Sequence, residues 1–116
     1  MYFYTNHGKT YNLRIFALQK TTKVERTQLL ELATKYGSPL YVYDTDIIAS
    51  QFNRLTTAFS GVKNLKLNYA VKALSNVNIL QFFKNLGAGL DTVSIQEVQL
   101  SLTTGIDPKR IIYTPN

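Results

Sequence analysis

The second half of the chain alternates short β-like runs with helical segments, and this order restricts the folds that it can adopt. Extended runs are predicted at residues 65–72, 89–94 and 110–114, and helices at residues 75–87 and 95–105 connect them. The strands therefore begin every ~20–25 residues, a spacing typical of consecutive βα units. Because neighbouring parallel strands need a crossover connection such as a helix, the pattern predicts an α/β fold with a parallel sheet.

The first part of the chain is less regular. Residues 2–18 mix aromatic and polar side chains and are expected to be extended. Thr22 and Glu25 have the spacing of a capping box, which predicts that a helix starts there, and Gly37 ends that helix. The run PLYVYD that follows is expected to form a short strand.

Capping residues and glycines delimit the next two helices. Asp44 or Thr45 begins the first of them, and Gly61 ends it. Ser75 or Asn76 begins the second, because a short polar side chain in front of a helix can accept hydrogen bonds from its first free N–H groups.

Lys72 stands at the end of the strand predicted at residues 65–72. Alternation places it on the face opposite Tyr69 and Val71. In barrels of βα units, the carboxyl ends of the strands carry the active site. A lysine there becomes a nucleophile when its neutral amine is populated and held in place, and an aldehyde cofactor such as pyridoxal phosphate captures it as a Schiff base. The alternative is an ordinary solvated lysine at a strand edge.

Several segments resemble one family of enzymes. YAVKALSN and LGAGLDTVSIQEVQLSLTTGIDPKRIIYTPN are similar to the pyridoxal-phosphate-dependent decarboxylases of the group that contains diaminopimelate decarboxylase, and YGSPLYVYD upstream resembles the same family. The resemblance covers residues 36–116 and implies the first βα units of a pyridoxal-phosphate-binding (β/α)₈ barrel of the alanine racemase type. Residues 1–35 are then expected to belong to the family's β-rich domain. Since a closed barrel needs roughly 200 residues or more, the chain is expected to hold only part of one.

The resemblance also implies roles for single residues. Lys72 of YAVK matches the lysine that binds the cofactor covalently. Asp91 of GLDTVS matches an acidic residue near that lysine, and Glu97 matches a glutamate that is also close to the cofactor. From the residues alone, Asp91 could instead be solvated or a hydrogen-bond partner at a strand end. Glu97 stands three residues after Ser94, so its role could be limited to closing a capping box. Asn116 matches an asparagine at the end of the third strand.

The activity that the resemblance implies is pyridoxal-phosphate-dependent decarboxylation of meso-diaminopimelate to L-lysine by a cytoplasmic homodimer. Alternatives within this chemistry are a decarboxylase of ornithine, arginine or carboxynorspermidine, an amino-acid racemase, and a non-catalytic carrier of pyridoxal phosphate. In the family, the phosphate-binding loops and the substrate-binding residues come from later segments. The chain by itself is therefore expected to be inactive.

Composition limits the other classes of function. The chain has 13 Lys and Arg against 7 Asp and Glu, a net charge of +6, so a small basic nucleic-acid-binding module is the alternative from a different class. No recognised nucleic-acid motif accompanies this charge. The chain has no cysteine and His7 is its one histidine, so a metal site is not expected. No apolar run approaches the roughly 18 residues of a membrane span, and binding to a membrane is not expected.

Overall fold

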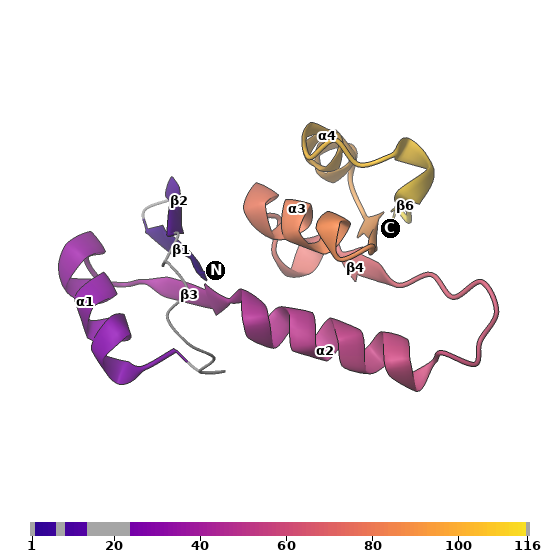
Figure 1. The fold of residues 1–116 in the computed structure, drawn as a ribbon. Coiled ribbons are helices and arrows are strands. Elements are labelled where there is room, and N and C mark those ends of the chain that lie inside the picture. The colour runs from indigo at the N-terminus through magenta and orange to yellow at the C-terminus, as the bar shows by residue number, and fades with distance from the viewer. Residues whose placement is uncertain (1, 7–8, 14–23, 116) are drawn as a thin grey trace. The chain divides into compact units, whose positions relative to one another are not determined.

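The computed structural model describes residues 2–6, 9–13 and 24–115 of the chain (Figure 1). The chain divides into two compact units, Met1–Gln51 and Phe52–Asn116. Each unit contains one three-stranded sheet, antiparallel in the first and parallel in the second.

The sheet of the first unit is formed by β1 (Tyr2–Asn6), β2 (Lys9–Leu13) and β3 (Tyr41–Asp44), in the order β2-β1-β3. The predicted extended conformation of residues 2–18 is confirmed for β1 and β2, and the rest of that range lies outside the described residues. The strand predicted in PLYVYD is confirmed as β3, which pairs antiparallel with β1.

Helix α1 (Arg26–Tyr36) begins three residues later than the spacing of Thr22 and Glu25 predicts. Glu25 is the N-cap, and its backbone N–H donates to Oε1 of Gln28 at 2.9 Å while its own side chain accepts from the N3 backbone. The predicted capping box was therefore wrong in its residues, because Glu25 and Gln28 supply both side chains. Thr22 lies outside the described residues. Gly37 ends the helix as predicted, with φ 83°.

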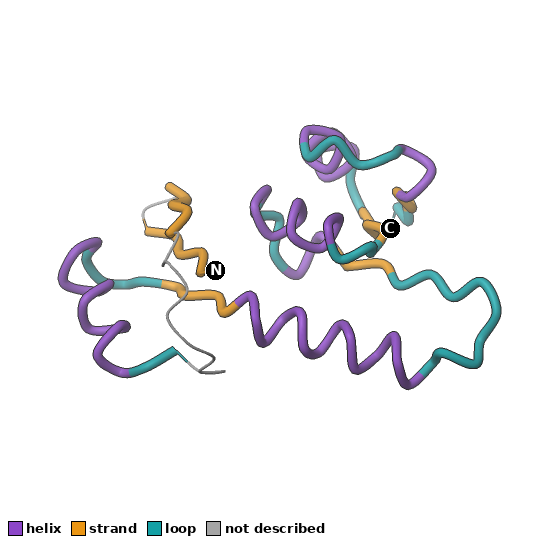
Figure 2. The backbone as a smooth tube through the Cα atoms, viewed as in Figure 1, coloured by secondary structure: helices purple, strands orange, loops and turns teal. Residues whose placement is uncertain are grey.

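Helix α2 (Thr45–Ala58) is capped by Asp44, the first of the two predicted capping residues. The Oδ1 atom of Asp44 accepts hydrogen bonds from the backbone N–H groups of Asp46, at 2.9 Å, and Ile47, at 3.2 Å. The helix ends before Gly61, and residues 59–67 form the extended loop that leads to the next strand (Figure 2).

The second unit contains the predicted α/β arrangement. Strands β4 (Asn68–Ala70), β5 (Gly89–Thr92) and β6 (Ile111–Tyr113) are parallel and lie in the order β4-β5-β6. Helices α3 (Val77–Asn85) and α4 (Ile95–Thr103) connect them. Each strand thus lies beside the next strand in the sequence, and the prediction of consecutive βα units in a parallel sheet is confirmed.

One face of this sheet contributes to the core. Tyr69 pairs with Leu90, and Leu90 with Ile111, so these three side chains share a face. Tyr69 and Ile111 pack against a cluster of buried residues, which are Val71, Leu80, Leu90 and Ile106. Residues contributed by the strands, by α3 and by the connections therefore bury one another, which stabilises the unit by removing apolar surface from water.

All three predicted strands of this sheet are shorter in the structure, and β5 ends at Thr92, two residues before its predicted end. The extended run predicted at residues 65–72 is reduced to Asn68–Ala70, and Val71–Ala73 forms a 3-10 turn, η1. Val71 is 0% exposed, so burying its side chain in the core accompanies the turn of the chain toward α3. The position of Lys72 is consequently set by this turn and not by strand alternation. Likewise, Arg110 ends a second 3-10 turn, η2 (Pro108–Arg110), in front of β6.

Candidate active site

The candidate site lies at the carboxyl ends of β4, β5 and β6, which parallel pairing brings to one edge of the sheet. Ala70 pairs with Asp91, and Asp91 with Ile112, in strands that are about 4.8 Å apart. Lys72 follows the end of β4 by two residues, and Thr114 directly follows β6. Lys72, Asp91 and Thr114 therefore come from three consecutive parallel strands at the same edge.

Lys72 occupies the middle of η1 and is exposed. Its amine makes no hydrogen bond and no ion pair with any residue that the structure describes. The backbone of the turn is closed by a hydrogen bond from the Leu74 N–H to the Val71 carbonyl, at 3.1 Å. An accessible amine without a competing partner in the described part of the chain, on a turn anchored by a buried residue, fits covalent attachment of an aldehyde cofactor.

Tyr69 holds the turn that carries Lys72. Its ring stacks on that of Phe83 in α3, with 4.0 Å between the centroids and an interplanar angle of 15°. Its hydroxyl donates to the carbonyl of Leu74 at 3.2 Å. Because Tyr69 precedes the turn and Leu74 follows it, this side chain links the two ends. Apolar alternation predicts the packing of Tyr69 but not the hydroxyl contact, which exists only because the 3-10 turn brings Leu74 back toward β4.

Replacing Tyr69 with phenylalanine should keep the stacking and remove this hydrogen bond. We expect the free energy of unfolding of the chain to fall by about 1 kcal/mol, because the part-buried carbonyl of Leu74 loses a donor. Urea denaturation followed by circular dichroism measures the change. The matched control is Tyr113→Phe, at a tyrosine that is 51% exposed, with an expected change below about 0.5 kcal/mol. Equal changes in the two variants would contradict the role of the Tyr69 hydroxyl.

Asp91 lies on the face of the sheet opposite the core, together with Ala70 and Ile112. Its side chain is partly buried, and its Oδ1 atom accepts a hydrogen bond from the Thr114 hydroxyl at 2.8 Å. The carboxylate is thus anchored from β6 while its strand neighbour β4 leads to Lys72. The sequence correctly predicted that Lys72 and Asp91 lie at the same edge of the parallel sheet. It identified Thr114 only as the end of a strand.

Glu97 lies in the first turn of α4 and is partly buried. Its Oε2 atom accepts from the backbone N–H of Val93 at 2.8 Å, and its own N–H donates to the Ser94 hydroxyl at 3.2 Å. The predicted capping box is therefore only half present: Ser94 accepts from Glu97, whereas the Glu97 side chain accepts from the residue before the N-cap. Proximity of Glu97 to a cofactor stays a prediction. Asn116 and His7 lie outside the described residues.

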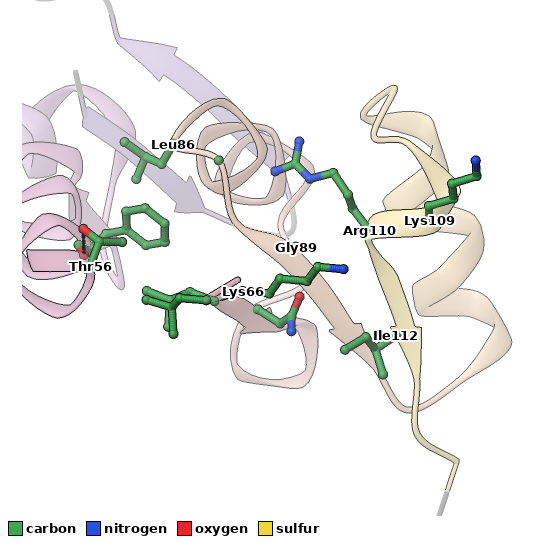
Figure 3. Close-up of a pocket in the computed structure, with 12 residues that line it drawn as sticks. Thr56, Lys66, Leu86, Gly89, Lys109, Arg110 and Ile112 are labelled. Carbon is green, nitrogen blue, oxygen red and sulfur yellow. Dashed lines mark hydrogen bonds between the residues drawn. The ribbon is translucent and has the colours of Figure 1, made fainter. Parts of the chain in front are cut away.

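A pocket of about 400 Å³ lies at the other edge of the sheet, around the amino ends of the strands (Figure 3). Lys66, Gly89 and Arg110 are among the residues that line it, whereas Lys72, Asp91 and Glu97 are not. Because amino and carboxyl ends of parallel strands lie at opposite edges, this pocket is separate from the candidate site.

Neither a metal-binding cluster nor a membrane-spanning helix is found in the described part of the chain. It contains no group of three or more histidine, cysteine or acidic side chains that could hold a metal ion. None of its helices has both the length and the apolar character needed to cross a bilayer.

Comparison with known proteins connects this site to a family. Residues 45–116, more than half of the chain, match the family described as "pyridoxal-dependent decarboxylase, pyridoxal binding domain". This range includes α2, the whole parallel sheet and all three predicted site residues.

Curated relatives match over a similar part of the chain. The diaminopimelate decarboxylase of Methanothermobacter thermautotrophicus is 42% identical over 88 residues, which are 75% of this chain and 21% of the relative. That of Helicobacter pylori strain J99 is 45% identical over 84 residues, 72% of this chain and 20% of the relative. That of Aquifex aeolicus is 40% identical over 90 residues, 78% of this chain and 21% of the relative. The chain spans about a fifth of the length of these relatives.

Proposed function

We propose, because this chain belongs to the family of pyridoxal-dependent decarboxylases, that it supplies the lysine-bearing part of a pyridoxal phosphate site. Lys72 is the residue that holds the cofactor, through its ε-amine. The observation that supports this role most directly is the exposed Lys72 amine at the carboxyl edge of the parallel sheet, without a partner among the described residues. The reaction is the decarboxylation of an amino acid.

The chemistry divides between the cofactor and the chain. Bound pyridoxal phosphate supplies an electron sink for the electron pair that remains when a carboxylate leaves as carbon dioxide. Lys72 would hold the cofactor through its ε-amine and, once the substrate amine is bound in its place, its Nζ would carry the proton that returns to the α-carbon. Turn η1 keeps this amine at the edge of the sheet during the exchange, since Val71 anchors the turn in the core.

The two carboxylates have supporting roles in this proposal. Asp91 places a negative charge on the strand next to the Lys72 turn, where it would stabilise positive charge on the bound cofactor. Glu97 fixes the connection between β5 and α4 through its bond to the Val93 N–H, and this connection borders the same edge. Both residues are neighbours of the cofactor in this proposal.

For the fold, we propose that the parallel sheet is the beginning of a (β/α)₈ barrel. The resemblance assigns residues 1–35 to a second, β-rich domain and residues 36–116 to the barrel. Because β3 pairs with β1, we propose that the β-rich domain also includes β3. The sequential order β4-β5-β6 supports a barrel, because every strand of a barrel of this type pairs with the next strand in the chain. We further propose that the complete enzyme is a cytoplasmic homodimer, as the family resemblance implies.

For the substrate, we propose meso-diaminopimelate, with L-lysine as the product, because the relatives described above are named diaminopimelate decarboxylases. The test uses the complete protein, meaning the full product of the gene that encodes this chain. It is incubated with pyridoxal phosphate and, separately, with meso-diaminopimelate, ornithine and arginine. We expect carbon dioxide and L-lysine from diaminopimelate, with a kcat/KM at least about 100-fold higher than for the other two.

Other outcomes would contradict one part of the proposal. Faster turnover of ornithine or arginine would show that the proposed substrate is wrong. Epimerised substrate without carbon dioxide would show that the reaction is that of a racemase. The 116-residue chain alone serves as the negative control, with no expected turnover.

A further inference from the structure

Thr114 links two strands at the carboxyl edge of the parallel sheet. Its hydroxyl lies 2.8 Å from Oδ1 of Asp91 and 3.3 Å from the carbonyl oxygen of Thr92. A hydroxyl has a single proton to donate, and the shorter contact leads to the carboxylate, which is also the stronger acceptor when ionised. The Asp91 carboxylate is therefore the main partner of this hydroxyl.

The hydroxyl itself is held in place by the backbone of Thr114. The Thr114 N–H donates to the carbonyl of Thr92 at 2.8 Å, which continues the pairing of β5 and β6 by one residue. Pro115 follows, and a residue before proline favours the extended conformation. The β-branched side chain of threonine is in addition restricted in its first torsion angle. Three local constraints thus aim the Oγ1 atom before it meets the carboxylate.

The carboxylate has less support of its own. The contact between Thr114 and Asp91 lies on the exposed side of the sheet, away from the buried cluster of the core. An aspartate in such a place distributes over several rotamers unless a hydrogen bond selects one. A donor from the neighbouring strand makes this selection.

We propose that Thr114 is a positioning residue that holds the Asp91 carboxylate in the orientation required beside the cofactor. The inference rests on the proposed function, in which Asp91 lies beside the cofactor that Lys72 holds. Thr114 acts through Asp91 and touches neither the substrate nor the cofactor in this account. Its loss should weaken cofactor binding only as far as the carboxylate contributes to that binding.

The test is a double-mutant cycle in the complete protein. Thr114→Val keeps the β-branched shape and removes the donor, Thr114→Ser keeps the donor, and Asp91→Asn removes the charge of the acceptor. The readouts are the dissociation constant of pyridoxal phosphate and the absorption spectrum of the bound cofactor, neither of which requires turnover. We expect Thr114→Val to weaken binding about tenfold and to shift the spectrum in the same direction as Asp91→Asn, and Thr114→Ser to remain within about threefold of the unmodified protein.

The cycle also separates positioning from structural support. If Thr114 acts through the carboxylate, adding Thr114→Val to Asp91→Asn causes no further loss, because the two residues form one unit. Additive losses, or an unchanged dissociation constant in Thr114→Val, would overturn the proposal. Thr114→Ala supplies a second test of donor loss should the valine variant fold poorly.

Two control variants complete the design. Thr92→Val removes a hydroxyl that donates to the Ile112 carbonyl at 2.9 Å, between the same two strands but away from the carboxylate. Thr92→Val should lower the melting temperature. Its effect on cofactor binding should be the same with and without Asp91→Asn. Lys72→Ala tests the proposed function separately. Unchanged cofactor binding in this variant would contradict the proposed function. Cofactor binding that depends on Lys72 but is unchanged in Thr114→Val would overturn only the inference about Thr114.

Discussion

Replacing Lys72 with alanine is expected to abolish decarboxylation by the complete protein, with kcat lowered about 10³-fold or more, since the residue both holds the cofactor and returns a proton. No other lysine of the parallel unit is placed to substitute for it. Lys63 and Lys66 precede β4 and Lys109 precedes β6, so all three lie on the amino side of the strands. Lys84 donates to the carbonyl of Thr104 at 2.8 Å, which ties its amine to the end of α4.

The matched control is Lys66→Ala. Lys66 belongs to the same stretch, KLNYAVK, and is also exposed, but it lies at the opposite edge of the sheet. This variant should retain activity and the absorbance of the bound cofactor. A third variant, Lys72→Arg, keeps the positive charge but supplies no neutral amine and should be as inactive as Lys72→Ala. Equal losses in Lys66→Ala and Lys72→Ala, or an active Lys72→Arg, would contradict a covalent role for Lys72.

Replacing Gly89 with alanine is expected to destabilise the parallel sheet by about 2–3 kcal/mol, because the site has no room for a methyl group. A Cβ atom there would lie 2.8 Å from the Arg110 carbonyl oxygen and would overlap the Asn68 side-chain oxygen. The amide of Asn68 can rotate away, whereas the backbone of Arg110 leads directly into β6. The Arg110 guanidinium also donates to the Ala88 carbonyl at 2.6 Å, which holds this segment against the start of β5.

Urea denaturation of the 116-residue chain, followed by circular dichroism, measures this effect. The control is Gly61→Ala, where an added Cβ would have no atom within 4 Å, with an expected change below about 0.5 kcal/mol. The double variant Asn68→Ala with Gly89→Ala should recover only part of the loss, since the contact with the Arg110 carbonyl remains. A Gly89→Ala variant as stable as Gly61→Ala would show that the two strands can separate without cost.

Local signals in the sequence were sufficient where one residue decides the structure. Asp44 and Asn76 cap their helices as predicted, and Gly37 ends α1. The parallel sheet followed from the alternation of strands and helices, because its connections leave few topologies. The start of α1 could not be predicted in the same way, because Thr22 and Glu25 both offer side chains that can cap a helix, and the choice between them depends on the surrounding structure.

The lengths of the strands depended on contacts that the sequence does not display. Residues 65–72 alternate like one strand, but the structure ends β4 at Ala70, where Val71 turns into the core. The position of Lys72 at the carboxyl edge was nevertheless predicted, because it depends on chain order along a parallel strand and not on where the last ladder bond falls.

The hydrogen bonds that support the site could not be predicted from the sequence. Asp91 and Thr114 are 23 residues apart, and their hydrogen bond requires the register between β5 and β6, which no local pattern specifies. The Tyr69 hydroxyl likewise meets Leu74 only across the turn. In contrast, the capping contact of Glu97 was predictable from its distance to Ser94, since both partners belong to the same helix start.

The most direct test of this account is to locate the side chain that binds the cofactor. The complete protein is incubated with pyridoxal phosphate, reduced with borohydride to make any lysine attachment permanent, and digested for mass spectrometry. The expected result is a single pyridoxyl label on the peptide that contains YAVK, at Lys72. A label on a different side chain, or no label at all, would contradict it.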